Sequence, residues 1–222
     1  MLTQTDRAFL IAIEPPLLAS QMAIVAARLR ANWPPPRLVE LTQSESEAVV
    51  RLAARCLGLT GSDAQGEVLR GLLKHPREAI VAAAEDALWT LWMRTYDDED
   101  LQGRFSDAVH RIQQGDFEAA LLHLDEVIAV EPDKAEAYHQ RALALHSLQR
   151  YAEAESAYLA TLERNPAHFA AAAGLGHLHV ERGEFAAALD FYKQALEIHP
   201  RLDEIRAIVP RLEAALKQRD VA

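Results

Sequence analysis

The chain has 222 residues, of which 50% are hydrophobic and 25% are charged, enough apolar material for one extended or two small folded units. The formal net charge of −10 argues against a binder of the phosphate backbone, since such proteins cluster Lys and Arg, so we expect no nucleic acid partner. The single cysteine, Cys56, excludes an internal disulfide and a multi-cysteine zinc site, which favours a reducing compartment and hence the cytoplasm.

The start of the chain lacks the features of a secretion signal. Its short apolar run has no basic region before it, and Asp6 and Glu14 flank the run. No apolar stretch in the sequence reaches the length that spans a bilayer. We therefore expect neither export nor a membrane partner.

Two alanine-rich segments, SESEAVVRLAARCLGL and PREAIVAAAEDALWTL, superpose with an offset of 31 residues and predict two long helices. Start signals support both helices, because Ser44 and Glu47 form a capping-box pattern and Pro76 suits a first helical turn. Shorter helices are expected after Gly61 and over WPPPRLVELTQ. The offset aligns Val50 with Val81, Ala53 with Ala84, Cys56 with Ala87 and Leu57 with Leu88.

This alternation of long and short helices resembles HEAT-like repeats of the short bacterial kind. The resemblance implies HEAT-like helix pairs over residues 1–98, with an opening helix over residues 17–30. It gives no account of residues 1–14.

The surface character changes at an acidic run over residues 97–100. Residues 1–96 carry equal numbers of basic and acidic side chains, so the whole net charge of −10 falls on residues 97–222. The run is either a linker or the start of a helix, where the helix dipole favours carboxylates, and we favour the helix start. Just before it, Trp89 and Trp92 share a helical face, and we expect them to seal the packing between the two repeat types.

The second half repeats every 34 residues. Pro132, Pro166 and Pro200 have this spacing, and the segments before them align without gaps. In each segment an aromatic residue is followed three residues later by alanine and four residues after that by a larger residue, which predicts paired antiparallel helices. The aligned sets are Phe117, Ala120 and Leu124; Tyr151, Ala154 and Tyr158; and Phe185, Ala188 and Tyr192.

These segments resemble the tetratricopeptide repeat family, whose unit is a 34-residue helix-turn-helix. The resemblance covers residues 101–200 and implies three repeats over residues 99–200, the first degenerate because Arg104 and Arg111 replace the family's aromatic residue and tyrosine. Residues 201–222 are expected to form a capping helix that Pro210 kinks or splits. The predicted fold is an all-α, right-handed α-α superhelix (solenoid) in which HEAT-like helix pairs lead into three tetratricopeptide units and the capping helix.

No sequence motif points to catalysis. The chain has no glycine-rich phosphate loop, no nucleophile elbow and no Cys or His pairing at zinc spacing. Cys56 falls on the packed stripe of its helix, which favours a buried small residue over a nucleophile. Some HEAT-repeat enzymes hold metal through His-Glu dipeptides, which this chain lacks, and the likeness to phycobilin lyases is limited to the HEAT-like helices. We expect no catalytic residue, no metal and no cofactor.

Histidine is concentrated after residue 100. His139 and His146 share a face of one predicted helix, and His177 lies on the corresponding helix of the next repeat. The family's geometry implies that these first helices line a concave groove. The histidines also suit ordinary solvated positions. A role in metal binding would require ligands on neighbouring helices to converge. The predicted peptide-binding residues are Glu136, His139, Gln140, Leu143, His146, Ala173, His177, Val180 and Glu181.

The residues also bear on the class of partner. Chaperone-binding members of the family hold a C-terminal carboxylate with a clamp of Lys, Arg and Asn. The resemblance implies no such clamp here, since the matching positions carry Phe105, Val109, Gln140, Ala171 and Leu175. The negative charge of residues 97–222 favours a neutral or basic ligand.

We therefore predict a non-enzymatic scaffold or adaptor that binds a peptide or helix of a partner protein in the concave groove. Two alternatives come from other classes. A HEAT-repeat lyase-like or metal-dependent enzyme would bind a metal or cofactor at defined stoichiometry. A self-assembling structural protein would form homo-oligomers, with Ile205 and Ile208 on the terminal helix as contacts.

Overall fold

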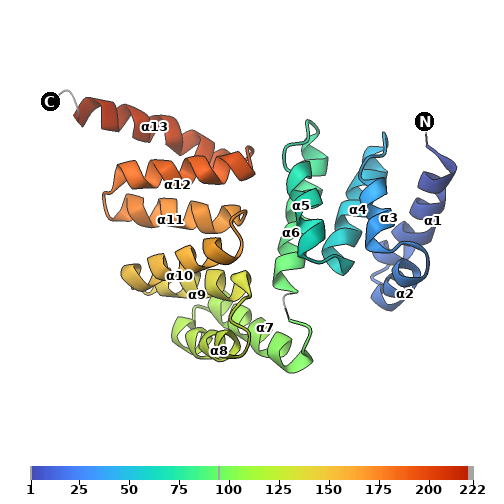
Figure 1. The fold of residues 1–222 in the computed structure, drawn as a ribbon, viewed down its shortest axis with the longest axis horizontal. Helices are drawn as coiled ribbons and strands as arrows, with labels where there is room; N and C mark the ends of the chain where they lie inside the picture. The colour runs from blue at the N-terminus through green and yellow to red at the C-terminus, as the bar shows by residue number, and fades with distance from the viewer. Residues whose placement is uncertain (1, 95, 220–222) are drawn as a thin grey trace. The chain divides into compact units, whose positions relative to one another are not determined.

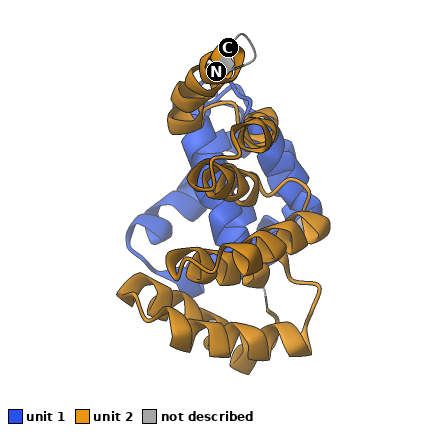
Figure 2. Cartoon of the chain, turned by 90° about the vertical axis from the view of Figure 1, so that its left-hand side faces the viewer, with its two compact units in different colours: residues 1–94 blue, residues 95–222 orange. Residues whose placement is uncertain are grey.

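Helices are the regular elements of the part of the chain that the computed structural model describes, residues 2–94 and 96–219, and no strand occurs in those residues (Figure 1). The all-α class predicted from the sequence is confirmed. Contacts divide the chain into two units, Met1–Arg94 and Thr95–Ala222, shown in separate colours in Figure 2. We call them unit 1 and unit 2.

Unit 1 is built around two long helices, α4 and α6, which pack against each other with α3 and α5 as the shorter helices. The residues that the 31-residue offset aligned are all buried, so the predicted register of the packed stripe is confirmed. The HEAT-like assignment of residues 1–98 stays a prediction. The helices of unit 1 are α1 (Gln4–Leu18), α2 (Met22–Asn32), α3 (Pro35–Leu41), α4 (Glu47–Thr60), α5 (Asp63–Leu72) and α6 (Glu78–Met93).

A glycine sets the distance between α4 and α6. A Cβ atom at Gly58 would lie 2.6 Å from the carbonyl oxygen and 2.8 Å from the Cα of Ala87. Because these are backbone atoms, they cannot move aside as a side chain can. The two long helices therefore approach each other as closely as they do because position 58 has no side chain.

The start of unit 1 differs from the prediction. The prediction of one opening helix over residues 17–30 is wrong, because two helices, α1 and α2, meet at Ser20. The φ angle of Ser20 is 55°, a left-handed value that a continuing helix does not allow. The start of α1 is fixed by a capping box: the Thr3 hydroxyl accepts from the amide of Asp6 at 3.0 Å, and the Asp6 carboxylate accepts from the amide of Thr3 at 2.8 Å.

Two further start signals in unit 1 were misplaced. Helix α4 begins at Glu47 with Ser46 as its N-cap residue, and the Ser44 hydroxyl accepts from the amide of Ser46 at 3.1 Å instead of capping the helix. Pro76 precedes the N-cap residue of α6, Arg77, and so lies outside the first turn. In both cases the helix begins one or two residues later than the local sequence pattern indicated.

Unit 2 follows the 34-residue period closely. Its helices are α7 (Glu99–Gln114), α8 (Phe117–Val130), α9 (Ala135–Ser147), α10 (Tyr151–Arg164), α11 (Phe169–Glu181), α12 (Phe185–Ile198) and α13 (Asp203–Arg219). The acidic run is a helix start, as favoured, because the Asp98 side chain accepts from the amide of Leu101 at 2.9 Å. The first helices lie side by side, with α9 in contact with both α7 and α11.

The last helix continues through its proline. Helix α13 runs unbroken from Asp203 to Arg219, so of the two predicted effects of Pro210 the split is wrong and the kink stays a prediction. Ile205 and Leu212, on either side of Pro210, are both buried in a core cluster with Tyr192 of α12. This packing holds the helix together where proline removes one backbone hydrogen bond.

The tryptophan pair lies at the end of α6. The rings of Trp89 and Trp92 meet edge to face with centroids 5.4 Å apart, and Trp92 is buried. Their role in joining the two repeat types stays a prediction. None of the helices in residues 2–94 and 96–219 is both long and apolar enough to cross a membrane.

The turns between paired helices of unit 2 lead to a stability prediction. Gly115, Gln149 and Gly183 occupy equivalent positions 34 residues apart, and all three have left-handed φ angles of 80°, 58° and 74°. Only Gln149 carries a side chain there, and that conformation costs a non-glycine residue about 1 kcal/mol. Gln149→Gly is expected to stabilise the protein by about 0.5–1 kcal/mol in urea denaturation. Gly183→Gln is the matched control, with a loss of similar size expected, and a destabilised Gln149→Gly variant would contradict the explanation.

Candidate functional site

Two glycines on α11 admit two tyrosines from neighbouring helices. A Cβ at Gly174 would lie 2.6 Å from the ring of Tyr158 on α10, and a Cβ at Gly176 would lie still closer to the ring of Tyr192 on α12. Both tyrosines are almost fully buried. The Tyr158 ring therefore fills the space beside Gly174.

The hydroxyl groups of these tyrosines meet histidines on the first helices. The Tyr192 hydroxyl lies 2.8 Å from Nδ1 of His177, and the Tyr158 hydroxyl lies 3.5 Å from Nδ1 of His146. Burial raises the pKa of Tyr192 to about 12, so this hydroxyl stays protonated at neutral pH, and the tautomer of His177 sets which of the two groups donates. Each histidine thus contacts the hydroxyl group of a buried tyrosine.

Glu181, the last residue of α11, connects two consecutive repeats. Its Oε2 lies 3.1 Å from Nε2 of His146 on α9, with 46% of the Glu181 side chain and 18% of the His146 side chain exposed. We use the term inner face for the surface of α9 and α11 that carries Leu143, His146, His177, Val180 and Glu181. All five are at least partly exposed.

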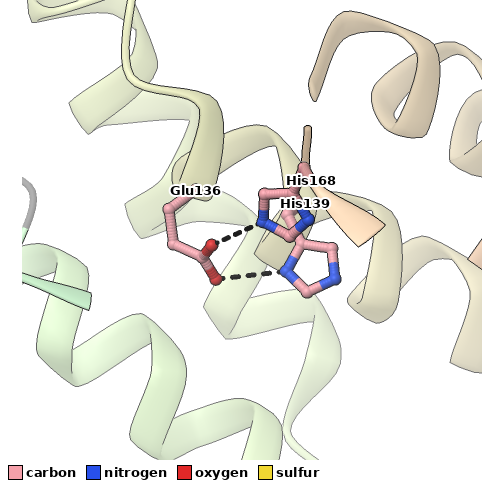
Figure 3. Close-up of side chains that lie close together, drawn as sticks. All are labelled: Glu136, His139 and His168. Atoms are coloured by element: carbon pink, nitrogen blue, oxygen red, sulfur yellow. Dashed lines mark hydrogen bonds and ion pairs between the residues drawn. The ribbon is translucent and has the colours of Figure 1, made fainter. Parts of the chain in front are cut away.

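A buried polar network lies deeper between α9 and α11 (Figure 3). The Glu136 carboxylate lies 3.1 Å from Nδ1 of His139 through one oxygen and 2.9 Å from Nε2 of His168 through the other. The Gln140 side-chain amide donates to Glu136 at 2.7 Å. His168 sits just before α11, so the network ties the second repeat to the third.

The protonation pattern of the network follows from its geometry. Nδ1 of His168 accepts from the backbone amide of Ala171 at 3.1 Å, which places the imidazole proton on Nε2, facing Glu136. Burial lowers the pKa of His168. Burial acts to raise the pKa of Glu136, but His139 and His168 outweigh it and hold that pKa below its usual range. Glu136 is therefore the ionised member of the network.

The donor atoms of Glu136, His139 and His168 lie within 4.8 Å of one another, a spacing that a metal ion can bridge. The orientation of His168 argues against such an ion. Coordination through Nε2 would need the proton on Nδ1, where the Ala171 amide already points its own hydrogen. The arrangement suits a hydrogen-bonded network that fixes the two repeats.

The predicted contact residues divide into two groups. Glu136, His139 and Gln140 are buried in the network with His168, whereas the contact of a peptide with the other predicted residues stays a prediction. Ala173 is partly buried and packs against the core cluster of α12 and α13. His168 was missed, although a histidine directly before a predicted helix is a possible N-cap residue. The five positions compared with the carboxylate clamp, Phe105, Val109, Gln140, Ala171 and Leu175, are all buried.

The buried histidine makes unit 2 sensitive to acid. Because the pKa of His168 is lowered on folding, the unfolded chain binds a proton first as pH falls below about 6.5, and stability decreases from there downward. The lowered pKa of Glu136 adds a second loss below about 4.5, in the same direction. The melting temperature is expected to fall from pH 7.5 to pH 5 and again to pH 4. His168→Asn, which keeps a capping side chain without a titrating group, should flatten the first step; equal slopes in the two proteins would refute this cause.

Comparison with protein families places repeats in unit 2. A tetratricopeptide repeat model matches residues 139–202, and a TPR repeat model matches residues 111–149. The Hsp70-Hsp90 organizing protein of Triticum aestivum is 31% identical over 93 residues, which cover 42% of this chain and 16% of that protein. A TPR repeat-containing protein of Rhizobium etli is 33% identical over 82 residues, which cover 37% of this chain and 40% of that protein. The match thus spans less than half of either relative.

Solved structures agree on the fold. The first TPR domain of Spaghetti (RPAP3), solved with an HSP90 peptide, superposes with a TM-score of 0.52 at 20% identity, over 55% of this chain and 98% of that one. The first TPR domain of human RPAP3 gives a TM-score of 0.51 at 18% identity, over 59% of this chain and 98% of that one. These matches support the predicted fold of helical repeats over the part of the chain that they cover.

Proposed function

Residues 111–202 are tetratricopeptide repeats, and on this basis we propose that the protein is a non-enzymatic adaptor that binds a peptide segment or helix of a partner protein on the inner face. The observation that carries the proposal is the composition of that face. Leu143 and Val180 offer partly exposed apolar contacts, and His146, His177 and Glu181 offer polar ones. Peptide recognition needs such a mixture, since apolar contacts supply affinity and polar groups fix register.

Rigidity of the inner face supports the same function. The network around Glu136 fixes α9 against the start of α11, and the buried rings of Tyr158 and Tyr192 support the two histidines. A surface that is already ordered loses little conformational freedom when it binds.

The alternatives lack comparable support. Burial raises the pKa of Cys56 to about 12, so this thiol is not a nucleophile at neutral pH. Ile205 is buried against α12, and Ile208, the other predicted contact between copies, is partly buried and packs against the same core cluster. Cys56, the single and buried thiol, also suits the reducing environment of the cytoplasm, where we place the adaptor.

The partner segment is proposed to be neutral or basic. The net charge of −10 on residues 97–222 repels an anionic tail. The positions matched to the carboxylate clamp hold buried side chains without Lys, Arg or Asn. A C-terminal carboxylate therefore has no matching cation at those positions, and we do not assign the ligand of the relatives to this chain.

Affinity capture with two matched variants tests the proposal. Leu143→Gln with Val180→Thr adds polarity to the inner face at nearly constant size. Leu122→Gln with Leu159→Gln does the same on α8 and α10, where both leucines are exposed. Partners retained by the wild type are expected to remain on the second variant and to be lost from the first, with unchanged helical circular dichroism spectra for all three proteins. Loss from the second variant alone would overturn the assignment to the inner face.

A further inference from the structure

We propose that the protein forms a symmetric dimer in which an exposed apolar stripe of α1 packs against the same stripe of a second copy in antiparallel orientation. We use the term α1 stripe for Ala8, Ile11, Pro15 and Leu18, which follow one another at alternating intervals of three and four residues and are all exposed. This inference goes beyond the proposed function, because it concerns unit 1 and not the inner face. It also differs from self-assembly through α13.

Helix α1 is apolar on two opposite sides. On one side it buries Phe9, Ile13 and Pro16 in unit 1. The α1 stripe lies on the other side, because Ile11 follows Phe9 by two residues, which is a rotation of about 200° around a helix. Ile11 is 74% exposed and Leu18 is 76% exposed, more than any other large hydrophobic residue that the structure describes. A helix that is apolar on both sides normally has packing partners on both sides.

The α1 stripe lies at one end of unit 1. Figure 1 shows α1 and α2 at the end of this unit that is opposite to α6. The outermost helix of a repeat array normally turns a polar side to solvent, which keeps the array soluble. Helix α13 of unit 2 does so, because no large hydrophobic side chain is exposed on it over residues 203–218. Helix α1 does not, which indicates that another surface covers its stripe.

Helix α1 is held in place although it contains two prolines. Pro16 has no N–H group, so the carbonyl oxygen of Ala12 lacks the donor that a regular helix supplies. Arg28 of α2 donates to this carbonyl oxygen from Nη1 instead. The α1 stripe is therefore displayed on an ordered helix, and little conformational freedom is lost when a partner packs on it.

Two charged residues beside the α1 stripe favour a second copy as the partner. Arg7 directly precedes Ala8 and Glu14 directly precedes Pro15, so the two charges lie one heptad apart along the same edge of the stripe. Both are exposed, and neither forms an ion pair within the described residues. In an antiparallel pair centred near Ile11, Arg7 of each copy lies opposite Glu14 of the other, whereas a parallel pair would bring like charges together. The two-fold symmetry thus gives two ion pairs, as a self-complementary contact requires.

Sedimentation velocity of the full chain, from about 1 to about 100 µM, tests the dimer. We expect the wild type to sediment as a dimer at the upper end of this range. Ile11→Gln with Leu18→Gln should stay monomeric, because it places polar side chains in the apolar contact. Leu122→Gln with Leu159→Gln makes the same exchange at exposed positions of unit 2 and should dimerise like the wild type. A monomeric wild type overturns the proposal and leaves the α1 stripe to a different protein, and a dimer of the Ile11→Gln, Leu18→Gln variant overturns it as well.

Charge reversal tests the antiparallel arrangement. Arg7→Glu and Glu14→Arg each turn both ion pairs into contacts of like charge, so each single variant should dimerise about tenfold more weakly than the wild type. Mixing the two single variants restores both pairs in a mixed dimer, and combining the substitutions in one chain restores them as well. Each new charge suits the helix dipole, so circular dichroism should show unchanged helicity. Single variants that associate like the wild type, or no recovery on mixing, overturn the antiparallel dimer.

Discussion

Glu136→Ala is expected to destabilise the protein by about 3–5 kcal/mol, because it removes the acceptor shared by a buried network. Glu136 is 2% exposed, and its carboxylate binds His139, Gln140 and His168. Without it, the Nε2 hydrogen of His168 loses its acceptor in a buried place, and the tie between the second and third repeats is lost.

Chemical denaturation measures this loss, and two variants make it specific. Glu118→Ala removes an exposed carboxylate from α8 and should change stability by less than about 0.5 kcal/mol. Glu136→Gln keeps the volume and one acceptor oxygen and should fall between the wild type and alanine. If Glu136→Ala costs no more than Glu118→Ala, the network does not hold the repeats together.

Gly58→Ala is expected to cost about 3 kcal/mol in unit 1, since the added methyl group would lie 2.6 Å from the carbonyl oxygen of Ala87. Helices α4 and α6 would have to separate along their packed stripe, which weakens the burial of residues such as Leu57 and Leu88. Helix propensity alone predicts the opposite sign, because alanine is favoured over glycine in a helix by about 1 kcal/mol.

Gly71→Ala is the matched control for this substitution. Gly71 is an exposed residue of α5, and no atom lies within 4 Å of the position that an added methyl group would take, so alanine there should stabilise the protein slightly. Thermal melting followed by circular dichroism compares the two variants. A Gly58→Ala protein that melts at or above the wild-type temperature would refute the close approach of α4 and α6.

The sequence predicted unit 2 better than the start of unit 1, for a physical reason. The 34-residue period averages over three copies, so Tyr158 and Tyr192 were assigned to the packed face from spacing alone, and both are buried. The start of unit 1 has no such repetition. There, one opening helix was predicted over residues 17–30, yet α1 already includes Pro15 and Pro16, and the break comes at Ser20.

The site was predicted less completely than the fold. Helical periodicity places Glu136 and His139 on the same face as His146. It does not reveal which side chains of the next repeat cover that face. His168, 32 residues after Glu136, covers the first two and leaves His146 partly exposed. The position of such a loop residue depends on tertiary packing, which a helical pattern does not encode.

Site-specific photo-crosslinking tests the central claim, that the inner face binds the partner. Ser147 and Ser156 are exposed, and each hydroxyl donates to the carbonyl oxygen four residues earlier, at 2.9 and 3.0 Å, so they form a matched pair on α9 and α10. Each serine is replaced in turn by p-benzoylphenylalanine. Each of the two variants is then mixed with the partner identified by affinity capture, and the mixture is irradiated. We predict a crosslinked product from position 147 and none from position 156. A product from position 156 with none from position 147 would contradict the proposed function.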